Sequence, residues 1–308
     1  MNFADKDGYI WLDGEWLPWR DAKIHVLTNT LHYGLGIFEG IRVYATSTGS
    51  AVFRLDEHLN RFYDSAKLVH LKLNVDKETL KQACLDALKK NKLIDAYIRP
   101  MSFLGSEGMG LHAKNLQAHT MVAAWEWGVY LGGDALTKGV RIKTSTYRRN
   151  HIDSLHAKAK VNGQYVNSMM ALREAQLSGF DEALMLDHTG YIAEGSGENF
   201  FIVKNGEVFT PTPQAILCGI TRDTIMKLCN DFDIPVYETQ LTRDMAYLAD
   251  EAFFTGTAAE VTPISEIDCR PIGTGKPGPI TQKLQQAYFD VVKGKNSNYS
   301  HWLTRGTE

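Results

Sequence analysis

Two short stretches in the second half of the sequence combine residue types and spacings that could do chemistry. In residues 194–199 (Glu-Gly-Ser-Gly-Glu-Asn), small residues between acids and an amide let the backbone pass close to a bound group. In residues 217–222 (Leu-Cys-Gly-Ile-Thr-Arg), Gly219 precedes an expected helix for which Thr221 could be the N-cap. The free N–H groups at such a helix N-terminus can bind an anion. Taken separately, each stretch also fits a structural role, as a tight β connection or a plain helix cap.

The composition indicates a globular protein of about two domains. The chain has 308 residues, of which 44% are hydrophobic and 22% charged, so it can bury a sizeable core. Its 33 basic and 36 acidic side chains give a net charge of −3, which argues against nucleic acid or an anionic membrane as a partner.

Cysteine spacing and apolar runs bear on location. The four cysteines form no Cys-x-x-Cys pair, which excludes a zinc ribbon or thioredoxin motif and indicates free thiols in a reducing compartment. Acidic residues stand near the N-terminus where a secretory signal is apolar, and no apolar run approaches the roughly 20 residues that cross a bilayer. His151 and His156 lack a His-Glu-x-x-His frame. We therefore expect a cytoplasmic protein without a metal.

The elements that must position the two stretches fall into two groups. In the first half, Asp13-Gly14 is a hairpin signal, and apolar spacing predicts helices at 56–70 and 76–91 and strands at 97–104 and 119–127. The pattern breaks at residues 129–134, which predicts a domain over 1–128, an interdomain loop at 129–136 and a domain over 137–308.

The second half is expected to be richer in strands. It predicts helices at 164–178, 221–231 and 279–293, with Gly179 ending the first of them. Short strands are expected between and around these helices, at 139–147, 183–186, 191–193, 200–203, 208–210, 235–238 and 251–254. The fold class is therefore α/β (α+β).

Together, the two stretches resemble the class IV aminotransferase signature. The matching positions, with their gaps, are Glu194, Asn199, Phe200, Phe201, Val208, Thr210, Leu217, Gly219, Ile220 and Arg222. The chain is similar to the fold-type IV enzymes that depend on pyridoxal 5′-phosphate (PLP), over nearly its whole length. This resemblance implies a small N-terminal α/β domain and a larger C-terminal, β-rich pseudo-barrel domain with helices.

The resemblance also implies how the cofactor is held. PLP needs a lysine, an acid at the pyridine nitrogen and an anion site for its phosphate. Glu194 would pair with the ring nitrogen and keep it protonated, because an opposite charge favours the charged form. Gly219, Ile220 and Thr221 would hold the phosphate, and Arg61 would reach the same phosphate. Without the resemblance, Arg61 is a solvated arginine on a helix.

Two lysines compete for the catalytic role. Lys158 and Lys160 project to the same face if the backbone is extended. The family has its lysine five residues before a tyrosine, which implies that Lys160 is catalytic and that Tyr165 hydrogen-bonds the phenolic oxygen of PLP. The resemblance further implies that Thr257 touches the PLP phosphate, and that the turn of Thr257, Ala258 and Ala259 receives the substrate α-carboxylate.

Within this fold type, the first half of the chain resembles the branched-chain amino acid aminotransferases. Residues 96–100 (Ala-Tyr-Ile-Arg-Pro) are similar to these enzymes, whereas D-amino acid aminotransferases typically carry Arg-x-His on this strand. The implied reaction transfers the amino group of Leu, Ile or Val to 2-oxoglutarate, giving 2-oxo acids and L-glutamate. The alternatives are a D-amino acid aminotransferase, an aminodeoxychorismate lyase, and an inactive protein of this fold that acts as an oligomeric binding module.

The resemblance implies a pocket for both substrates. Arg99 would receive the γ-carboxylate of glutamate, helped by Tyr33 and Tyr130, while Tyr97 would support the α-carboxylate. Met109, in the loop after residue 104, would reach the neighbouring subunit's pocket, which implies a homodimer as the active unit, often built into a hexamer. The remaining substrate-binding positions are Phe38, Gly40 and Trp127. Core packing is the other interpretation of these aromatic residues.

Overall fold

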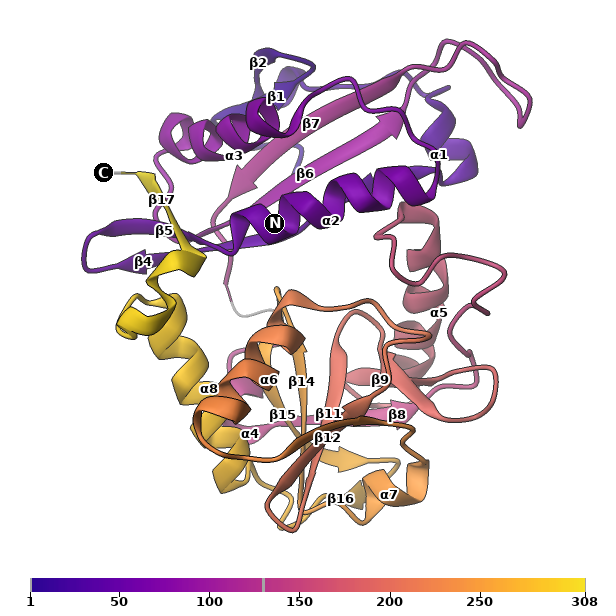
Figure 1. Ribbon diagram of the computed structural model, residues 1–308. Coiled ribbons are helices and arrows are strands. Elements are labelled where there is room, and N and C mark those ends of the chain that lie inside the picture. The colour runs from indigo at the N-terminus through magenta and orange to yellow at the C-terminus, as the bar shows by residue number, and fades with distance from the viewer. Residues whose placement is uncertain (1, 129–130, 308) are drawn as a thin grey trace. The chain divides into compact units, whose positions relative to one another are not determined.

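Two separate sheets, each in its own structural unit, organise the chain (Figure 1). The computed structural model describes residues 2–128 and 131–307. The first unit comprises Met1–Gly128, Ala159–Gly163 and Val291–Glu308, and the second comprises Val129–Lys158 and Gln164–Asp290. The expected domain boundaries follow the order of the chain, whereas the first unit takes up a short segment from the middle and another from the end.

The sheet of the first unit is antiparallel. Its main strand order is β17-β5-β4-β6-β7-β1-β2, and β3 pairs with β6. Figure 1 shows the C-terminal strand, in yellow, beside β5 from the first fifth of the chain. The bounds are β1 Tyr9–Leu12, β2 Glu15–Pro18, β3 Gly36–Phe38, β4 Ile41–Thr46, β5 Gly49–Phe53, β6 Ala96–Leu104, β7 Ala118–Trp125 and β17 Leu303–Thr307.

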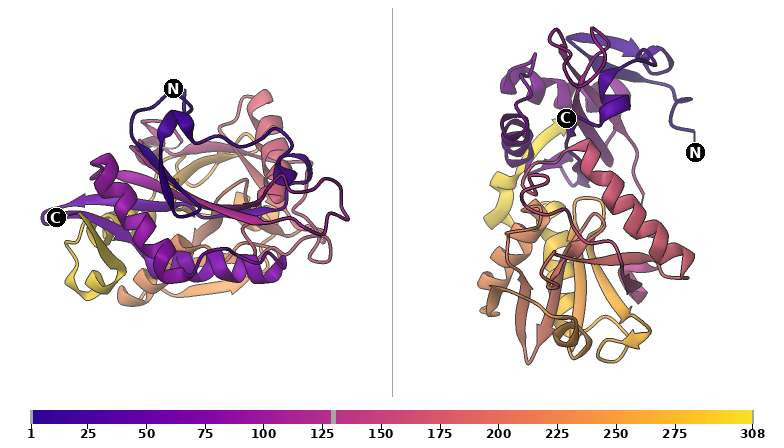
Figure 2. Two further views of the ribbon diagram at one scale, coloured as in Figure 1. Left: turned by 90° about the horizontal axis from the view of Figure 1, so that it is seen from above. Right: turned by 90° about the vertical axis from the view of Figure 1, so that its right-hand side faces the viewer.

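Two amphipathic helices, α2 (Leu55–Leu68) and α3 (Lys77–Asn91), pack on one side of this sheet, as both views of Figure 2 show. Helix α3 begins where the Asp76 side chain accepts a hydrogen bond from the N–H of Thr79 at 2.9 Å. Apolar residues three and four apart then face the strands. The short elements of this unit are α1 (Asn29–Tyr33), η1 (Trp19–Asp21) and η3 (Ser297–Trp302). The core includes Leu59, Phe62, Leu80, Leu88, Ile41 and Ile98.

The hairpin expected at Asp13-Gly14 is confirmed. Leu12 pairs with Glu15, and both turn residues have positive φ, 49° at Asp13 and 98° at Gly14. This backbone is the turn that suits the twist of two antiparallel strands, and Asp-Gly adopts it at low cost. The Asn205-Gly206 turn between β11 and β12 has the same character, with φ of 51° and 83°.

The second unit confirms the expected pseudo-barrel. Its strands run in the order β10-β9-β8-β15-β14-β11-β12-β13, and an additional pairing of β10 with β11 closes six of them into a ring. Large apolar residues, among them Phe200, Phe254 and Ile264, form the core of this unit. The bounds are β8 Val140–Thr144, β9 Glu182–Leu186, β10 Ile192–Gly195, β11 Asn199–Lys204, β12 Glu207–Pro211, β13 Val236–Thr239, β14 Glu251–Gly256, β15 Glu260–Ile267 and β16 Arg270–Pro271.

The three helices expected in the second half lie close to their expected positions, as α5 (Tyr165–Leu177), α6 (Ile220–Asp231) and α8 (Pro279–Val292). The short helices α4 (Ala135–Lys138), α7 (Arg243–Tyr247) and η2 (Asn162–Gln164) are not expected from the sequence. Gly179, just beyond the end of α5, has a φ of 81°, which only glycine adopts freely. In the part of the chain that the structure describes, no helix is long and apolar enough to cross a membrane.

Candidate active site

Lys160 lies on a short segment that is fastened to the first unit on both sides. The Lys160 N–H donates to Ser65 Oγ of α2 at 3.0 Å, and its C=O accepts from the N–H of Phe38 in β3 at 3.1 Å. Ala159 and Val161 are buried in the core, so the Lys160 side chain leaves the opposite face of the segment. Its Nζ lies 5.0 Å from the centre of the Phe38 ring.

Lys158 differs from Lys160 in its surroundings. It belongs to the second unit, it is exposed, and its Nζ donates to the C=O of Ile216 at 3.1 Å. The structure therefore assigns different environments to the two lysines, although their positions in the sequence are nearly equivalent.

Arg61 is not a solvated helical arginine. Its Nε and Nη2 donate to Oε1 and Oε2 of Glu39 at 2.6 and 2.9 Å, and the Arg61 side chain is 13% exposed. Glu39 is fully buried, and its Oε2 also accepts from His58 Nδ1 at 2.8 Å. Burial alone raises the pKa of Glu39, but the charge of Arg61 and the hydrogen bonds from Arg61 and His58 outweigh it and hold this pKa well below its usual range.

His58 completes this cluster. Burial lowers the pKa of His58, opposed by Glu39 and assisted by the charges of Arg61 and Lys160. A neutral imidazole that donates from Nδ1 to Glu39 satisfies this arrangement. Sequence patterns singled out neither His58 nor Glu39 as a site residue, because their partners lie many residues away.

Five of the residues expected to bind substrate come together on the sheet of the first unit. Tyr97 and Arg99 are two apart on β6 and share a face. Arg99 Nη2 donates to the Tyr97 hydroxyl at 3.4 Å, and the Arg99 guanidinium carbon lies 4.6 Å from the centre of the Phe38 ring. Trp127 stacks on Tyr97 at 4.8 Å between ring centres. A Cβ on Gly40 would overlap the Tyr97 hydroxyl, so any residue other than glycine at position 40 would clash with the Tyr97 side chain.

Arg99 carries a donor that the described residues leave unsatisfied. Its Nε is buried and has no hydrogen-bond partner among them. Buried polar groups are nearly always paired, so an unpaired guanidinium nitrogen beside a wall of aromatic rings is a feature to be expected of a binding site. Phe38 links it to Lys160, because the Lys160 amine and the Arg99 guanidinium both lie within 5.0 Å of the Phe38 ring centre.

The remaining expected residues of the first half stand apart from this group. Tyr33 ends α1 and is 44% exposed, and Met109, in the loop between β6 and β7, is 45% exposed. Neither has a described contact with Tyr97 or Arg99. Tyr130 lies outside the described residues.

In the second unit, Glu194 is held by a cation and by N–H donors. It is buried on β10 opposite Asn199 on β11. Its Oε1 forms an ion pair with Arg149 Nε at 2.9 Å, and its Oε2 accepts from Asn199 Nδ2 and from the N–H of Leu217, each at 3.2 Å. A buried carboxylate with a cation and two donors is stable in its ionised form. No sequence pattern points to Arg149, whose side chain is only 9% exposed.

The two signature stretches meet at Asn199. Its Nδ2 donates to the C=O of Leu217 at 2.9 Å, and its Oδ1 fills the space that a Cβ on Gly219 would need. Gly219 is the N-cap of α6. The interpretation of Thr221 as N-cap is therefore wrong, because the helix already begins at Ile220 and Thr221 is buried within its first turn.

Arg222 and Thr210 of the signature have a structural role. Arg222 is buried, and its Nη2 donates to Glu238 of β13 at 2.6 Å and to the C=O of Pro211 at 2.9 Å. Thr210 Oγ1 donates to the C=O of Phe200 at 2.9 Å. The Arg222 bonds attach α6 to β12 and β13, and they thereby fix the position of the N-terminus of this helix.

The turn of Thr257, Ala258 and Ala259 connects β14 to β15. Thr262 Oγ1 donates to the C=O of Ala259 at 2.6 Å and so fixes the end of the turn. Asn199 pairs with Thr255 on the adjacent strand, which places this turn and the signature turn at one end of the ring. Tyr165 opens α5, where Gln164 Nε2 donates to the C=O of His156 at 2.9 Å.

Each unit, taken by itself, carries groups of the kinds that PLP needs. In the first unit these are the amine of Lys160 and the guanidinium of Arg61 held by Glu39. In the second unit they are the Glu194 carboxylate, paired with Arg149, and the N-terminus of α6, where Gly219 has no side chain. The residues that the structure describes hold no group of three or more His, Cys, Asp or Glu side chains that could bind a metal ion.

Comparison with known proteins identifies the family. Residues 36–267 match the family model described as Amino-transferase class IV. The branched-chain-amino-acid aminotransferase of Pseudomonas aeruginosa is 53% identical over 304 residues, 99% of each chain, and that of Escherichia coli K12 is 43% identical over 300 residues, 97% of each chain.

Solved structures show the same likeness in three dimensions. The T.th. branched-chain amino acid aminotransferase with pyridoxamine 5′-phosphate superposes with a TM-score of 0.95 at 46% identity, covering 98% of this chain and 99% of that one. These findings confirm the resemblance seen in the sequence. The chain belongs to the class IV aminotransferases, and within them to the branched-chain amino acid aminotransferases.

Proposed function

We propose that the protein catalyses PLP-dependent transamination of L-leucine, L-isoleucine and L-valine with 2-oxoglutarate, giving branched-chain 2-oxo acids and L-glutamate. Relatives with this enzyme name align over nearly the full chain. The observation that carries the proposal is the Phe38 ring, which has the Lys160 amine and the Arg99 guanidinium within 5.0 Å of its centre. An amine and a guanidinium with one unpaired nitrogen, placed around one apolar ring, match a site that must bind an apolar side chain and a carboxylate in turn.

Lys160 carries the proton transfer. When bound, PLP supplies the electron sink for the charge that forms at the substrate Cα. The amine of Lys160 removes the proton from Cα as base and returns one as acid. The hydrogen bonds at its N–H and C=O fix the backbone from which the side chain starts. This reduces the number of positions that the Lys160 amine can adopt relative to the substrate Cα.

The proposed contacts lie at two ends of the cofactor, the pyridine nitrogen and the phosphate. Glu194, kept ionised by Arg149, would pair with the pyridine nitrogen. Arg61, fixed by Glu39, and the N–H groups from Gly219 to Thr221 would hold the phosphate, with Thr257 as a further contact. Tyr165 would donate to the phenolic oxygen. A pyridoxamine phosphate complex and an N-(5′-phosphopyridoxyl)-L-glutamate complex of the T.th. relative support this choice of cofactor.

Substrate specificity follows from the apolar wall and the Arg99 cation beside it. Phe38, Tyr97 and Trp127 accept a branched side chain, and Gly40 keeps Tyr97 in position. Arg99 binds the γ-carboxylate of glutamate through the nitrogen that has no partner among the described residues. Tyr33, Tyr130 and Met109 close the pocket, and the turn of Thr257, Ala258 and Ala259 receives the α-carboxylate. A 4-methylvaleric acid complex of the T.th. relative supports a pocket of this kind.

The assembly and location are part of the same proposal. The active unit is a homodimer, in which the loop bearing Met109 serves the neighbouring subunit, and dimers can build into a hexamer. Cys84 and Cys229 are buried as thiols, a state that the reducing cytoplasm maintains.

An absorbance titration tests this function directly. L-leucine should remove the visible band of the lysine-bound cofactor from the loaded enzyme, and 2-oxoglutarate should restore it. A response to D-alanine in place of L-leucine would transfer the assignment to a D-amino acid aminotransferase. If the PLP-loaded protein shows no visible band, Lys160 is not the residue that binds the cofactor covalently.

A further inference from the structure

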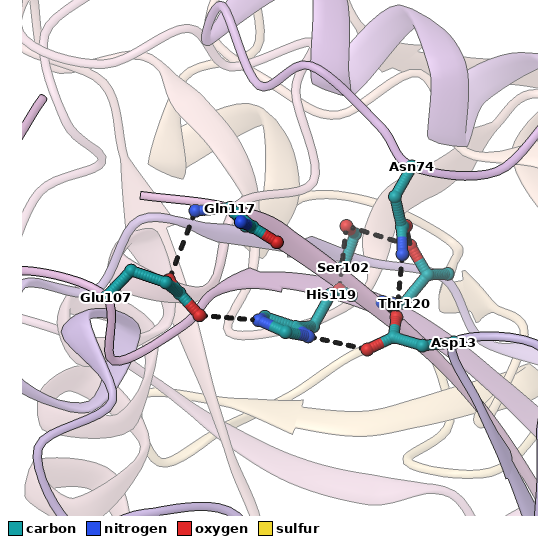
Figure 3. Close-up of polar contacts among 7 residues, drawn as sticks. All are labelled: Asp13, Asn74, Ser102, Glu107, Gln117, His119 and Thr120. Atoms are coloured by element: carbon teal, nitrogen blue, oxygen red, sulfur yellow. Dashed lines mark hydrogen bonds and ion pairs between the residues drawn. The ribbon is translucent and has the colours of Figure 1, made fainter. Parts of the chain in front are cut away.

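A second cluster of charged side chains lies outside the candidate active site. His119, at the start of β7, is placed between Asp13 of the β1–β2 turn and Glu107 of the loop between β6 and β7 (Figure 3). Its Nδ1 lies 2.5 Å from Asp13 Oδ2, and its Nε2 lies 3.0 Å from Glu107 Oε1. All three side chains are between 27% and 30% exposed.

The geometry requires a proton on both ring nitrogens. A neutral imidazole has one donor and one acceptor, whereas two ionised carboxylates can only accept. Both carboxylates also accept a backbone N–H, Glu107 from Gln117 at 3.1 Å and Asp13 from Thr120 at 2.8 Å, so both act as acceptors toward the chain as well as toward the ring. His119 therefore bridges them as an imidazolium.

The directions of the pKa shifts of Glu107 and His119 agree with an imidazolium that carries a proton on both nitrogens. The hydrogen bond from His119 lowers the pKa of Glu107 to about 2. Burial alone lowers the pKa of His119, but the two carboxylates outweigh it and raise this pKa above its ordinary value. Lys72 also lines the shallow hollow beside the imidazole, and the Phe103 ring stacks on the imidazole at 5.6 Å between ring centres.

One side of the bridge is rigid. Asp13 lies in the hairpin turn, and its Oδ1 accepts from Asn74 Nδ2 at 2.7 Å as well as from the N–H of Thr120. Thr120 Oγ1 donates to Asn74 Oδ1 at 2.6 Å and lies 3.1 Å from Ser102 Oγ. Figure 3 shows these groups gathered on the Asp13 side of the ring. Asp13 is thus a fixed point of the sheet.

The other side of the bridge is the base of the loop that carries Met109. Gly105 and Gln117 close this loop through a backbone hydrogen bond of 3.0 Å. A Cβ on Gly105 would overlap both the His119 ring and the Glu107 carboxylate, so the ion pair packs directly on the loop's first residue. The C=O of Gly105 accepts from the N–H of Asn29 at 2.7 Å, which connects the same point to α1, the helix that ends in Tyr33.

We propose that His119 is a positioning residue, which as an imidazolium clamps the base of the 105–117 loop to the β1–β2 hairpin and so holds Met109 and Tyr33 for substrate binding. The part that concerns substrate rests on the proposed function. Loss of one ring proton breaks one of the two bonds. The clamp is therefore complete below the ordinary pKa of 6.5 and opens as the pH rises through the raised pKa of the folded protein.

Two measurements on the PLP-loaded enzyme test the clamp. The first is amide hydrogen exchange of the peptide that covers residues 105–117, compared between wild type and His119→Gln at the same pH. A glutamine amide can donate to one carboxylate only. We expect the variant to exchange about three- to fivefold faster at pH 6, with the difference vanishing as the pH rises. The second is the pH profile of KM and kcat for L-leucine, in which His119→Gln should raise KM by a similar factor at low pH and leave kcat within about twofold.

Partner and control variants make the test specific. Glu107→Gln should have the same effects, and the double variant should add nothing to either single one. His70→Asn, which changes an exposed histidine of the same unit, should leave both measurements unchanged.

Each outcome bears on a different part of the proposal. Equal exchange in wild type and His119→Gln at every pH overturns the clamp. Faster exchange with an unchanged KM keeps the clamp but overturns its effect on substrate, and with it the proposed roles of Met109 and Tyr33. A wild-type enzyme that exchanges as expected but does not turn over L-leucine contradicts the proposed function and leaves the clamp supported.

Discussion

Glu39 holds Arg61 through two parallel hydrogen bonds, of 2.6 and 2.9 Å, from a position with no exposure to solvent. This pairing fixes the plane of the guanidinium before any ligand binds. Arg61 is proposed to bind the cofactor phosphate, and Glu39, although itself an acid, would then prepare an anion site. The buried His58 adds a third hydrogen bond to the same carboxylate.

Glu39→Gln should weaken both the fold and the binding of PLP. Removing one partner leaves the Arg61 charge poorly compensated, which typically costs about 3 kcal/mol of unfolding free energy. Denaturant unfolding and a PLP titration would measure the two effects. Asp56→Asn, which breaks a more exposed ion pair with Lys81 of the same unit, is the control and should change little.

The pH dependence of this variant has a definite sign. The pKa of Glu39 is lowered in the folded protein, so its contribution is fully present above the ordinary value of 4.5 and is lost as the pH falls through the folded value. The difference in unfolding free energy between wild type and Glu39→Gln should therefore shrink under acid. A difference that grows below pH 4.5 would contradict the ion pair.

Lys160→Ala and Lys158→Ala should separate two lysines that the sequence alone presents as rivals. Loss of Lys160 would remove both the proposed covalent attachment and the proposed proton carrier, which should lower turnover by about 10⁴-fold or more. Lys158 donates to the carbonyl of Ile216, a neutral backbone group, so its variant should retain the visible band and most of the activity. A single absorbance spectrum of each loaded protein distinguishes them, and the reverse result would move the catalytic role to Lys158.

The separation of these lysines shows what sequence pattern can and cannot provide. Local patterns predicted the Asp13-Gly14 hairpin, helices α2, α3, α5 and α6, and the signature stretches, because turns, caps and apolar periodicity are properties of neighbouring residues. The partners of the key acids were not predictable in this way. Arg149 precedes Glu194 by 45 residues, and no spacing rule connects them.

Thr221 shows a related limit. A threonine near an expected helix start favours an N-cap by residue type, yet Gly219 is the N-cap, and the Asn199 side chain fills the space where a side chain at position 219 would lie. The make-up of the first unit is another case, since Ala159–Gly163 joins it through a bridge between Val161 and Ile37 and backbone bonds to Phe38 and Gly34. Contacts between residues far apart in the sequence determine where the site residues lie, and the periodicity of apolar residues does not predict such contacts.

Arg149→Gln should affect the enzyme through Glu194. Without the guanidinium, a buried carboxylate keeps the N–H donors of Asn199 and Leu217 but loses this cation, and its ionised form loses support. We expect a fall in kcat of about tenfold or more and weaker retention of PLP, measured by steady-state kinetics and by dialysis of the loaded enzyme. The neighbouring Arg148→Gln removes an exposed arginine that donates to the carbonyls of Asp187 and His188, and it should be nearly neutral. Equal effects of both variants would contradict the special role of Arg149.

Gly219→Ala should damage the N-terminus of α6. The φ of −68° suits alanine, so any effect must come from the new methyl group, which would overlap Asn199 Oδ1. Moving Asn199 disturbs its bonds to Glu194 and Leu217, and overpacking of this kind costs roughly 1–3 kcal/mol. The affinity for PLP should fall together with thermal stability. Gly133→Ala, where a Cβ meets nothing within 4 Å, is the control and should behave as wild type.

Arg99→Gln should separate the two substrates of the proposed reaction. The buried Nε of Arg99 has no partner among the described residues, and the guanidinium lies 4.6 Å from the centre of the Phe38 ring. A γ-carboxylate would satisfy that nitrogen, whereas the side chain of leucine has nothing to offer it. Because a charge-assisted hydrogen bond contributes about 1.5–3 kcal/mol, kcat/KM for 2-oxoglutarate should fall roughly 10- to 150-fold. The half-reaction with L-leucine, followed by the loss of the visible band, should slow by no more than about threefold. Equal losses for both substrates would show that Arg99 supports the aromatic wall through its contacts with Phe38 and Tyr97, and the binding of glutamate would then need another cation.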